Sequence, residues 1–212
     1  MTALPPLYSA SVPVFRHYLG RAQDMAERAG PALMTAQIAD AFPAAQQFAT
    51  AAGFALRAAC PLAGREVPDL PRALGPRLAV VRATLGAMKP AEFIGDEARI
   101  ITHKAGFAEL DQTAEQFLHL FGLPNFFFHL TMGYAALRAA GLPLGKEDFD
   151  GLHSYPAGFA LCHSHAGRPR PSKNPPPPQT GPFASGSSAY LGTRPGQRAL
   201  EPRRRMDHPQ CH

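Results

Sequence analysis

Chemically versatile side chains gather in the stretch GLPNFFFH, residues 122–129. Asn125 and His129 are four positions apart there, so on a helix they share one face. An imidazole in that position could act as a general base, hold a metal ion or make a structural hydrogen bond. Pro124 removes one backbone donor and therefore predicts a kink or a break in the helix that carries the pair.

A metal ion needs about three protein ligands that converge on one point. His119 and His129 lie ten residues apart, which on a straight helix means about 80° of rotation and roughly 15 Å of rise. They cannot share an ion at that separation. The stretch 43–60, which we expect to form a neighbouring helix, holds no histidine. We therefore predict no metal site, and no motif indicates another cofactor.

Cys60 is the only cysteine before residue 154 and the one candidate thiol nucleophile there. It stands before Pro61 at the expected end of a helix, where the negative partial charge of the helix terminus disfavours a thiolate. We expect a small, unreactive apolar side chain. The patterns GxSxG and GxGxxG and the P-loop are absent, so the sequence predicts no catalytic motif.

The three cysteines form no CxxC pair, as is usual for proteins of a reducing cytoplasm. The first fifteen residues lack a basic region followed by an uninterrupted apolar run, which argues against a secretory signal. No stretch reaches the roughly 18–20 apolar residues of a membrane-spanning helix. We predict a cytoplasmic protein with no membrane partner.

Four helices are predicted from apolar residues that recur every three or four positions. Their expected spans are residues 12–29, 43–60, 74–88 and 111–140. Glycine or proline ends each of them, at Gly30-Pro31, Pro61, Pro90 and Gly141. Four helices of this length predict an all-α fold, an antiparallel four-helix bundle. The many alanines of 43–60 predict a close approach by a neighbouring helix.

An irregular crossover over residues 91–110 precedes the last helix. It contains a β-branched run, ARIITH, that can pair with the segment GFAEL as a small hairpin. Thr113 and Gln116 can form a capping box at the start of the last helix, because the hydroxyl and the amide can each satisfy a free backbone N–H.

The charge of the chain divides near residue 153. Residues 154–212 carry eight Arg and Lys against two acids, a net charge of +6, and 11 of the 23 prolines. Residues 1–153 have a net charge of −1, which argues against nucleic-acid binding by a folded domain. We predict a helical domain over 1–153 and a disordered tail over 154–212. The tail could be a basic tether, a polyproline ligand or a segment with no role.

An ordered series of motifs runs through the first part of the chain: SVPVF (11–15), IADAFP (38–43), LPNFFFH (123–129), GYAALR (133–138) and GLPLGKEDF (141–149). Over residues 7–152 the chain resembles the DUF1993 family, a domain-of-unknown-function family within the DinB/YfiT-like four-helix-bundle superfamily. The resemblance implies a DinB-like bacterial bundle, commonly a homodimer. The tail departs from the family's usual length and would be an unrelated extension or an out-of-frame reading.

Several relatives in that superfamily bind a divalent metal through three histidines, one from the second helix and two from the fourth, a turn apart. Some are thiol-dependent transferases. The present sequence departs from this pattern, because its expected second helix lacks histidine. The leading hypothesis is therefore a homodimeric helical bundle that binds a small molecule or a partner. A DinB-type metal- or thiol-dependent transferase is the alternative, and a DNA-associated interaction protein is the third class.

Five residues form the candidate pocket: His129, Asn125, Gln47, Asp40 and Tyr134. In the structural interpretation, Asn125 satisfies a backbone carbonyl near Pro124, and His129 bonds Asp40 or Gln47. In the functional interpretation, these side chains surround a ligand and His129 acts as a general base or polarising group. The three phenylalanines are expected to fill the core or an interface, with at least one reaching solvent, a partner or the crossover.

Overall fold

The computed structural model describes residues 3–93, 97–154 and 156. Its elements in chain order are α1 (Pro6–Ser9), α2 (Val12–Leu33), α3 (Ala44–Leu62), α4 (Leu74–Gly86), the 3₁₀ turn η1 (Pro90–Phe93), strands β1 (Ile100–Ala105) and β2 (Ala108–Thr113), α5 (Ala114–Gln116), the π-helical segment η2 (Phe117–Gly122), α6 (Leu123–Ala139) and α7 (Lys146–Asp150). Apart from residues 154 and 156, the predicted disordered tail lies outside the described residues.

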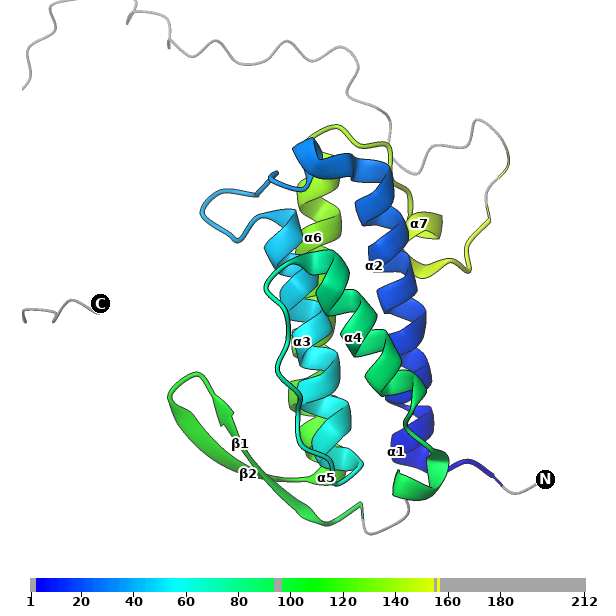
Figure 1. The fold of residues 1–212 in the computed structure, drawn as a ribbon, viewed down its shortest axis with the longest axis vertical. Helices are drawn as coiled ribbons and strands as arrows, with labels where there is room; N and C mark the ends of the chain where they lie inside the picture. The colour runs from blue at the N-terminus through cyan, green and yellow to red at the C-terminus, as the bar shows by residue number, and fades with distance from the viewer. Residues whose placement is uncertain (1–2, 94–96, 155, 157–212) are drawn as a thin grey trace, which may run out of the picture. The chain divides into compact units, whose positions relative to one another are not determined.

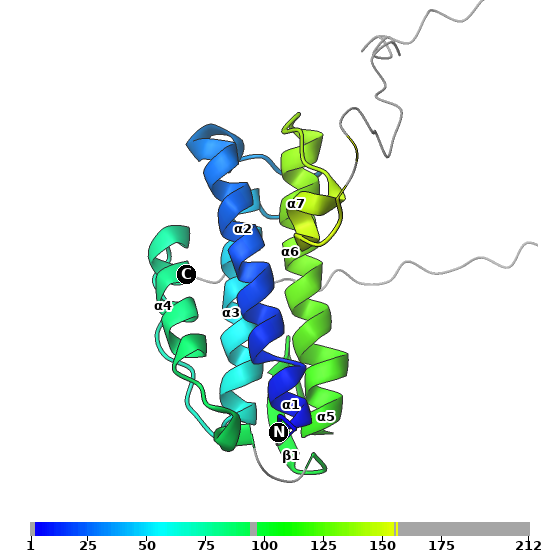
Figure 2. The ribbon, with the colours of Figure 1, turned by 90° about the vertical axis from the view of Figure 1, so that its right-hand side faces the viewer.

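Four long helices, α2, α3, α4 and α6, lie side by side and enclose the apolar core (Figure 1). In Figure 2, α4 and α6 stand on opposite sides of α2. The fold is mostly helical, as predicted, with one small two-stranded sheet in addition. No helix in the described ranges is both long and apolar enough to cross a membrane.

The direction of α4 differs from the prediction. The first turns of α3 and α4 lie together, since Arg77 Nη1 donates to the Ala49 carbonyl over 3.1 Å, so the two helices run parallel (Figure 1). The connection between them, residues 63–73, returns along the length of α3. Eleven extended residues can span up to about 36 Å, and the 19 residues of α3 need only about 28 Å. The antiparallel arrangement expected throughout the bundle is therefore wrong for this pair.

Of the four predicted helix ends, two agree with the structure, one is wrong, and α4 ends at Gly86 rather than at residue 88. Gly30 leaves the helical region with φ 63° and ψ 172°, so the regular part of α2 ends there as expected. Gly141, with φ 97°, follows the C-cap of α6. Pro61 does not stop α3, which continues to Leu62, because the N–H of Ala63 still reaches the Ala59 carbonyl over 3.0 Å.

The last long helix contains the predicted irregularity at its start. Thr113 caps α5 in a capping box, with the Gln116 N–H donating to Thr113 Oγ1 over 3.1 Å. The chain then forms the π-helical η2 and enters α6 at Leu123, so that Pro124 lies in the first turn of α6. A π-helical segment places an extra residue in the turn, and the expected kink takes this form.

The predicted hairpin is present. β1 pairs with β2 from Ile100 opposite Thr113 to Ala105 opposite Ala108, and Gly106 makes the turn with φ 61°. One face of the hairpin meets the bundle, because the His103 ring lies 4.2 Å from the Phe121 ring. The crossover thus covers the end of the α3–α6 pair.

Candidate functional site

His129 forms a hydrogen bond between two helices. Its Nδ1 lies 2.7 Å from Oε1 of Gln47, so α6 is joined to α3 at this point. An amide oxygen only accepts, hence Nδ1 carries the hydrogen and Nε2 the lone pair. Gln47 is 3% exposed, and its Nε2 donates weakly to the Phe42 carbonyl over 3.4 Å. The bond therefore satisfies a buried polar side chain in the core.

The environment of His129 favours the neutral form of the imidazole. The ring is half-buried and stacks on Phe54, with 5.5 Å between ring centroids and 17° between planes. Burial lowers the pKa of His129 below its usual value of about 6.5. The guanidinium of Arg57 covers the same Phe54 ring at 4.5 Å. A neutral imidazole with a free lone pair can accept a proton, which is the chemistry of a general base.

The other three predicted residues are placed differently. Asn125 Nδ2 donates to the Phe121 carbonyl over 2.8 Å, the local backbone bond expected beside Pro124. Asp40 is exposed in the loop before α3, and no hydrogen bond or ion pair joins it to His129 within the described ranges. Tyr134 accepts a bond from Arg138 Nη1 over 3.1 Å, and its ring packs on α7. A pocket shared by all five residues stays a prediction.

The three phenylalanines divide between core and surface. Phe126 is fully buried, and its ring contacts that of Phe15 at 4.9 Å. Phe127 packs against Tyr18 at 4.9 Å. Phe128 is 59% exposed. The expectation that one ring of the three reaches solvent is confirmed.

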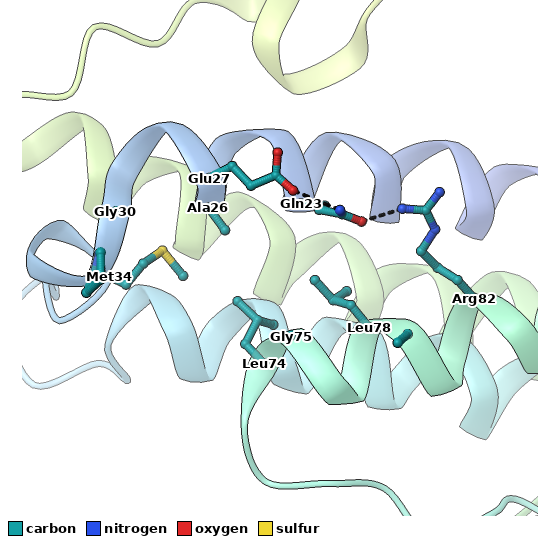
Figure 3. A pocket seen from close by; sticks show the side chains of 11 residues that line it. Gln23, Ala26, Glu27, Gly30, Met34, Leu74, Gly75, Leu78 and Arg82 are labelled. Atoms are coloured by element: carbon teal, nitrogen blue, oxygen red, sulfur yellow. Dashed lines mark hydrogen bonds between the residues drawn. The ribbon is translucent and has the colours of Figure 1, made fainter.

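A second candidate site lies between α2 and α4, where the sequence analysis placed only core packing. It is a groove, open to solvent, with about 630 Å³ of space, and is called here the α2–α4 cavity (Figure 3). Its walls are mostly apolar or small: Ala26, Met34, Leu74, Gly75, Leu78 and Ala79. Concave, mostly apolar cavities of this size are typical of small-molecule sites.

Three polar side chains line one side of the α2–α4 cavity. Arg82 Nη1 donates to Oε1 of Gln23, and Gln23 Nε2 donates to Oε1 of Glu27 over 2.8 Å (Figure 3). The amide thus links a cation on α4 to a carboxylate on α2. A ligand in this cavity would contact apolar walls along most of its length. Along one edge it would meet the carboxylate of Glu27, the amide of Gln23 and the guanidinium of Arg82, in that order.

Small residues leave unfilled space along the contact between α2 and α4, called here the α2–α4 seam. A Cβ added to Gly30 or Gly75 would meet no atom within 4 Å, and Ala26 and Ala79 extend no further than Cβ. The sequence signal was present in these residues, yet small side chains more often mark a close helix contact.

The sequence profile of a family described as Domain of unknown function (DUF1993) matches residues 6–150. The chain belongs to the DUF1993 family. A crystal structure of a DinB family member from Shewanella denitrificans, determined at 1.83 Å resolution, has a similar fold, with a TM-score of 0.61 and 24% sequence identity. The match covers 71% of this chain and 95% of that chain. No curated protein matches the sequence.

The DinB-like fold allows a test of the superfamily's three-histidine metal site. That site needs one histidine on the second long helix and two on the last, a turn apart. α3 contains no histidine, and His129 is the one histidine of α6. Nδ1 of His129 already forms a hydrogen bond with Gln47, so these helices do not fit such a site. The described residues contain no group of three or more His, Cys, Asp and Glu able to hold a metal ion.

Cys60 is fully buried in this DUF1993 member. Burial raises the pKa of its thiol to about 11, and the nearby Arg65 opposes the change only partly. A thiol with this pKa carries almost no thiolate at neutral pH, and the thiolate is the nucleophile. The side chain is therefore unsuited to nucleophilic catalysis.

Proposed function

We propose that this protein is a cytoplasmic small-molecule-binding bundle, without catalysis of its own, whose ligand occupies the α2–α4 cavity. The observation that carries the proposal is the cavity itself, with about 630 Å³ of space between apolar walls. Small-molecule sites typically measure about 300–1,000 Å³ and combine apolar walls with a few polar groups. Gln23, Glu27 and Arg82 supply such groups here.

The pocket predicted around His129 is the second candidate. Its support is the neutral imidazole, half-buried against Phe54, whose Nε2 retains a lone pair. The bond to Gln47 favours a structural role instead, because it occupies Nδ1 and satisfies a buried amide. A metal- or thiol-dependent transferase is disfavoured by the lack of histidine on α3 and by the buried thiol of Cys60.

A homodimer is the proposed assembly. Leu120 and Phe128, on η2 and α6, are 67% and 59% exposed, and large exposed apolar side chains are common at subunit interfaces. Sedimentation equilibrium should show a dimer for the wild-type chain and a shift toward monomer for Phe128→Glu. A wild-type monomer at micromolar concentration would contradict this assembly.

A neutral fluorescent probe tests the α2–α4 cavity. N-phenyl-naphthylamine has an apolar body, and its fluorescence rises when it leaves water. We expect saturable binding to the wild-type chain with a stoichiometry near one. Ala79→Phe and Ala26→Phe fill the cavity from opposite walls, and each should weaken binding about tenfold or more, the loss of roughly 1.4 kcal/mol.

Ala87→Phe is the matched control. It adds the same side chain at an exposed position at the C-terminal end of α4, outside the cavity. Circular dichroism should show the wild-type helix content in all three variants. The proposal fails if the probe does not bind, or if Ala87→Phe weakens binding as much as the two cavity variants do.

A further inference from the structure

We infer that the ligand of the α2–α4 cavity is an amphipathic monoanion, with its apolar body between Ala26 and Leu78 and its acidic group at Arg82 and Arg16. The inference rests on the proposed function and adds the chemical class and the orientation of the ligand. It follows from the order of charges along the seam between α2 and α4.

A second hollow lies on the same seam and shares one lining residue with the α2–α4 cavity. This hollow measures about 600 Å³ and is lined by Pro13, Arg16, His17, Arg82 and Ala83. Arg82 lines both spaces. Because α2 and α4 run in opposite directions, the first turns of α2 face the last turns of α4. The two spaces therefore follow one another along the seam, called here the groove, and Arg82 lines both.

The second hollow is basic. Arg16 and Arg82 line it and no acidic residue does, and neither arginine forms a salt bridge within the described part of the chain. Arg82 donates one N–H to Gln23, and the other N–H groups of its planar guanidinium remain available to a ligand. Guanidinium forks bind carboxylate and phosphate oxygens in pairs. The hollow thus offers two unpaired cations to an acidic group.

The neighbouring charges do not cancel this preference. Asp24 pairs with Arg21 on the same helix. The Asp150 carboxylate on α7 pairs with His153, and its carbonyl lies 2.6 Å from Nε2 of His17. His17 therefore closes the edge of the hollow, and the two arginines remain as the groups available to an anion.

A carboxylate lines the groove between Gln23 and its Met34 end and disfavours an anion there. Glu27 lines the α2–α4 cavity beside Gly30, beyond Gln23 from Arg82. A carboxylate there disfavours a second carboxylate nearby and leaves the Met34 end to an apolar group. The ligand is therefore oriented with its acidic group toward Arg82.

The helix geometry sets the length of the apolar body. Leu74 and Arg82 line the two ends of the α4 wall, eight residues apart. Eight helical residues rise about 12 Å, which corresponds to an extended chain of roughly eight to ten carbons. Decanoate, which has ten carbons and one carboxylate, is therefore a suitable test molecule.

The experiment measures displacement of N-phenyl-naphthylamine from the full chain by decanoate, decanol and decylamine, with the two ionic molecules below their critical micelle concentrations and decanol below its solubility limit. The three molecules share an alkyl chain and differ only in the head group. We expect decanoate to bind about tenfold or more tightly than decanol, and decylamine most weakly. Arg82→Met and Arg16→Met should each weaken decanoate binding roughly fivefold, the effect of one exposed charge pair, and change decanol binding by a smaller factor.

Lys89→Met is the matched control, because it removes the same charge from an exposed residue outside the groove. It should leave all three affinities at their wild-type values. Equal affinities for decanoate and decanol, tighter binding of decylamine, or an effect of Lys89→Met equal to that of Arg16→Met would each overturn the inference. Failure of the fluorescent probe itself to bind would instead overturn the proposed function.

Discussion

The α3–α6 seam and the α2–α4 seam use the same small residues with opposite results. On the first, a Cβ added to Gly133 would lie 2.5 Å from Cε1 of the buried Phe48, and one added to Gly122 would lie 2.7 Å from Cβ of Ala58. On the second, a Cβ added to Gly75 meets nothing within 4 Å. On the α3–α6 seam, glycine allows the two helices to pack in close contact. On the α2–α4 seam, the space beside glycine is not filled by a neighbouring side chain.

This difference separates stability from binding in the molecule. The closed seam buries the large aromatic and apolar side chains of α3 and α6 and the bond between Gln47 and His129. The open seam keeps a cavity in which Leu78 belongs to the core and Ala26, Met34 and Leu74 pack at its edge. We therefore expect substitutions on the α3–α6 seam to change the free energy of unfolding, and those on the α2–α4 seam to change ligand binding.

The largest effect is expected from closing the space that Gly133 leaves for Phe48. Gly133→Ala forces the ring of Phe48 from its position in a fully buried site. Overpacking of this kind costs about 1–3 kcal/mol, and we expect the upper part of that range. Urea unfolding followed by circular dichroism measures the change in the free energy of unfolding.

The same substitution on the open seam is the matched control. Gly75→Ala adds a methyl group where there is room and should change the free energy of unfolding by less than about 1 kcal/mol, in the stabilising direction. Equal destabilisation by Gly133→Ala and Gly75→Ala would contradict the contrast between the two seams.

A smaller effect is expected from the bond between His129 and Gln47. His129→Ala should lower the free energy of unfolding by about 2 kcal/mol, through the lost hydrogen bond and the lost stacking on Phe54. A double-mutant cycle with Gln47→Ala should give a coupling energy of about 1 kcal/mol. In a control cycle that combines His129→Ala with Tyr134→Phe, the two changes in the free energy of unfolding should be additive. A coupling energy near zero between residues 47 and 129 would contradict a stabilising role for the hydrogen bond between them.

The smallest effect is expected in the dependence of stability on pH. Burial lowers the pKa of His129 in the folded state, so the unfolded chain binds more protons below about pH 7. The contribution of neutral His129 is complete above the unfolded pKa and is lost as the pH falls through the folded pKa. His129→Gln should therefore show a smaller fall in the free energy of unfolding between pH 7 and pH 5 than the wild-type chain.

Urea titrations of both proteins at four pH values measure this difference. Tyr134→Phe serves as the control, and its stability should follow the wild-type pH dependence. An unchanged slope in His129→Gln would show that the folded environment does not disfavour the charged imidazole.

Local patterns in the sequence predicted the elements of the fold well. The apolar spacing gave the four helices, Gly30 and Gly141 ended two of them, and the capping box at Thr113 and the hairpin are both present. These features depend on a few neighbouring residues. The parallel course of α4 was missed, because it depends on the path of residues 63–73, which have no apolar periodicity.

The sites were less predictable than the fold. The sequence marked His129 and named Gln47 as one of two partners, since a half-buried imidazole must find an acceptor nearby. The distinction between Gln47 and exposed Asp40 required the structure. The α2–α4 cavity was missed, because an alanine such as Ala26 looks the same in a tight contact and beside an empty space.

The most direct test of the account is to locate bound N-phenyl-naphthylamine by nuclear magnetic resonance. Backbone amide shifts of the ¹⁵N-labelled chain would be followed during titration with the probe. We predict that the perturbed amides cluster in α2 from Gln23 to Gly30 and in α4 from Leu74 to Arg82, with the amides of Gln47 and His129 unchanged. Perturbations centred on Gln47 and His129 would contradict the account and place the ligand on the α3–α6 seam instead.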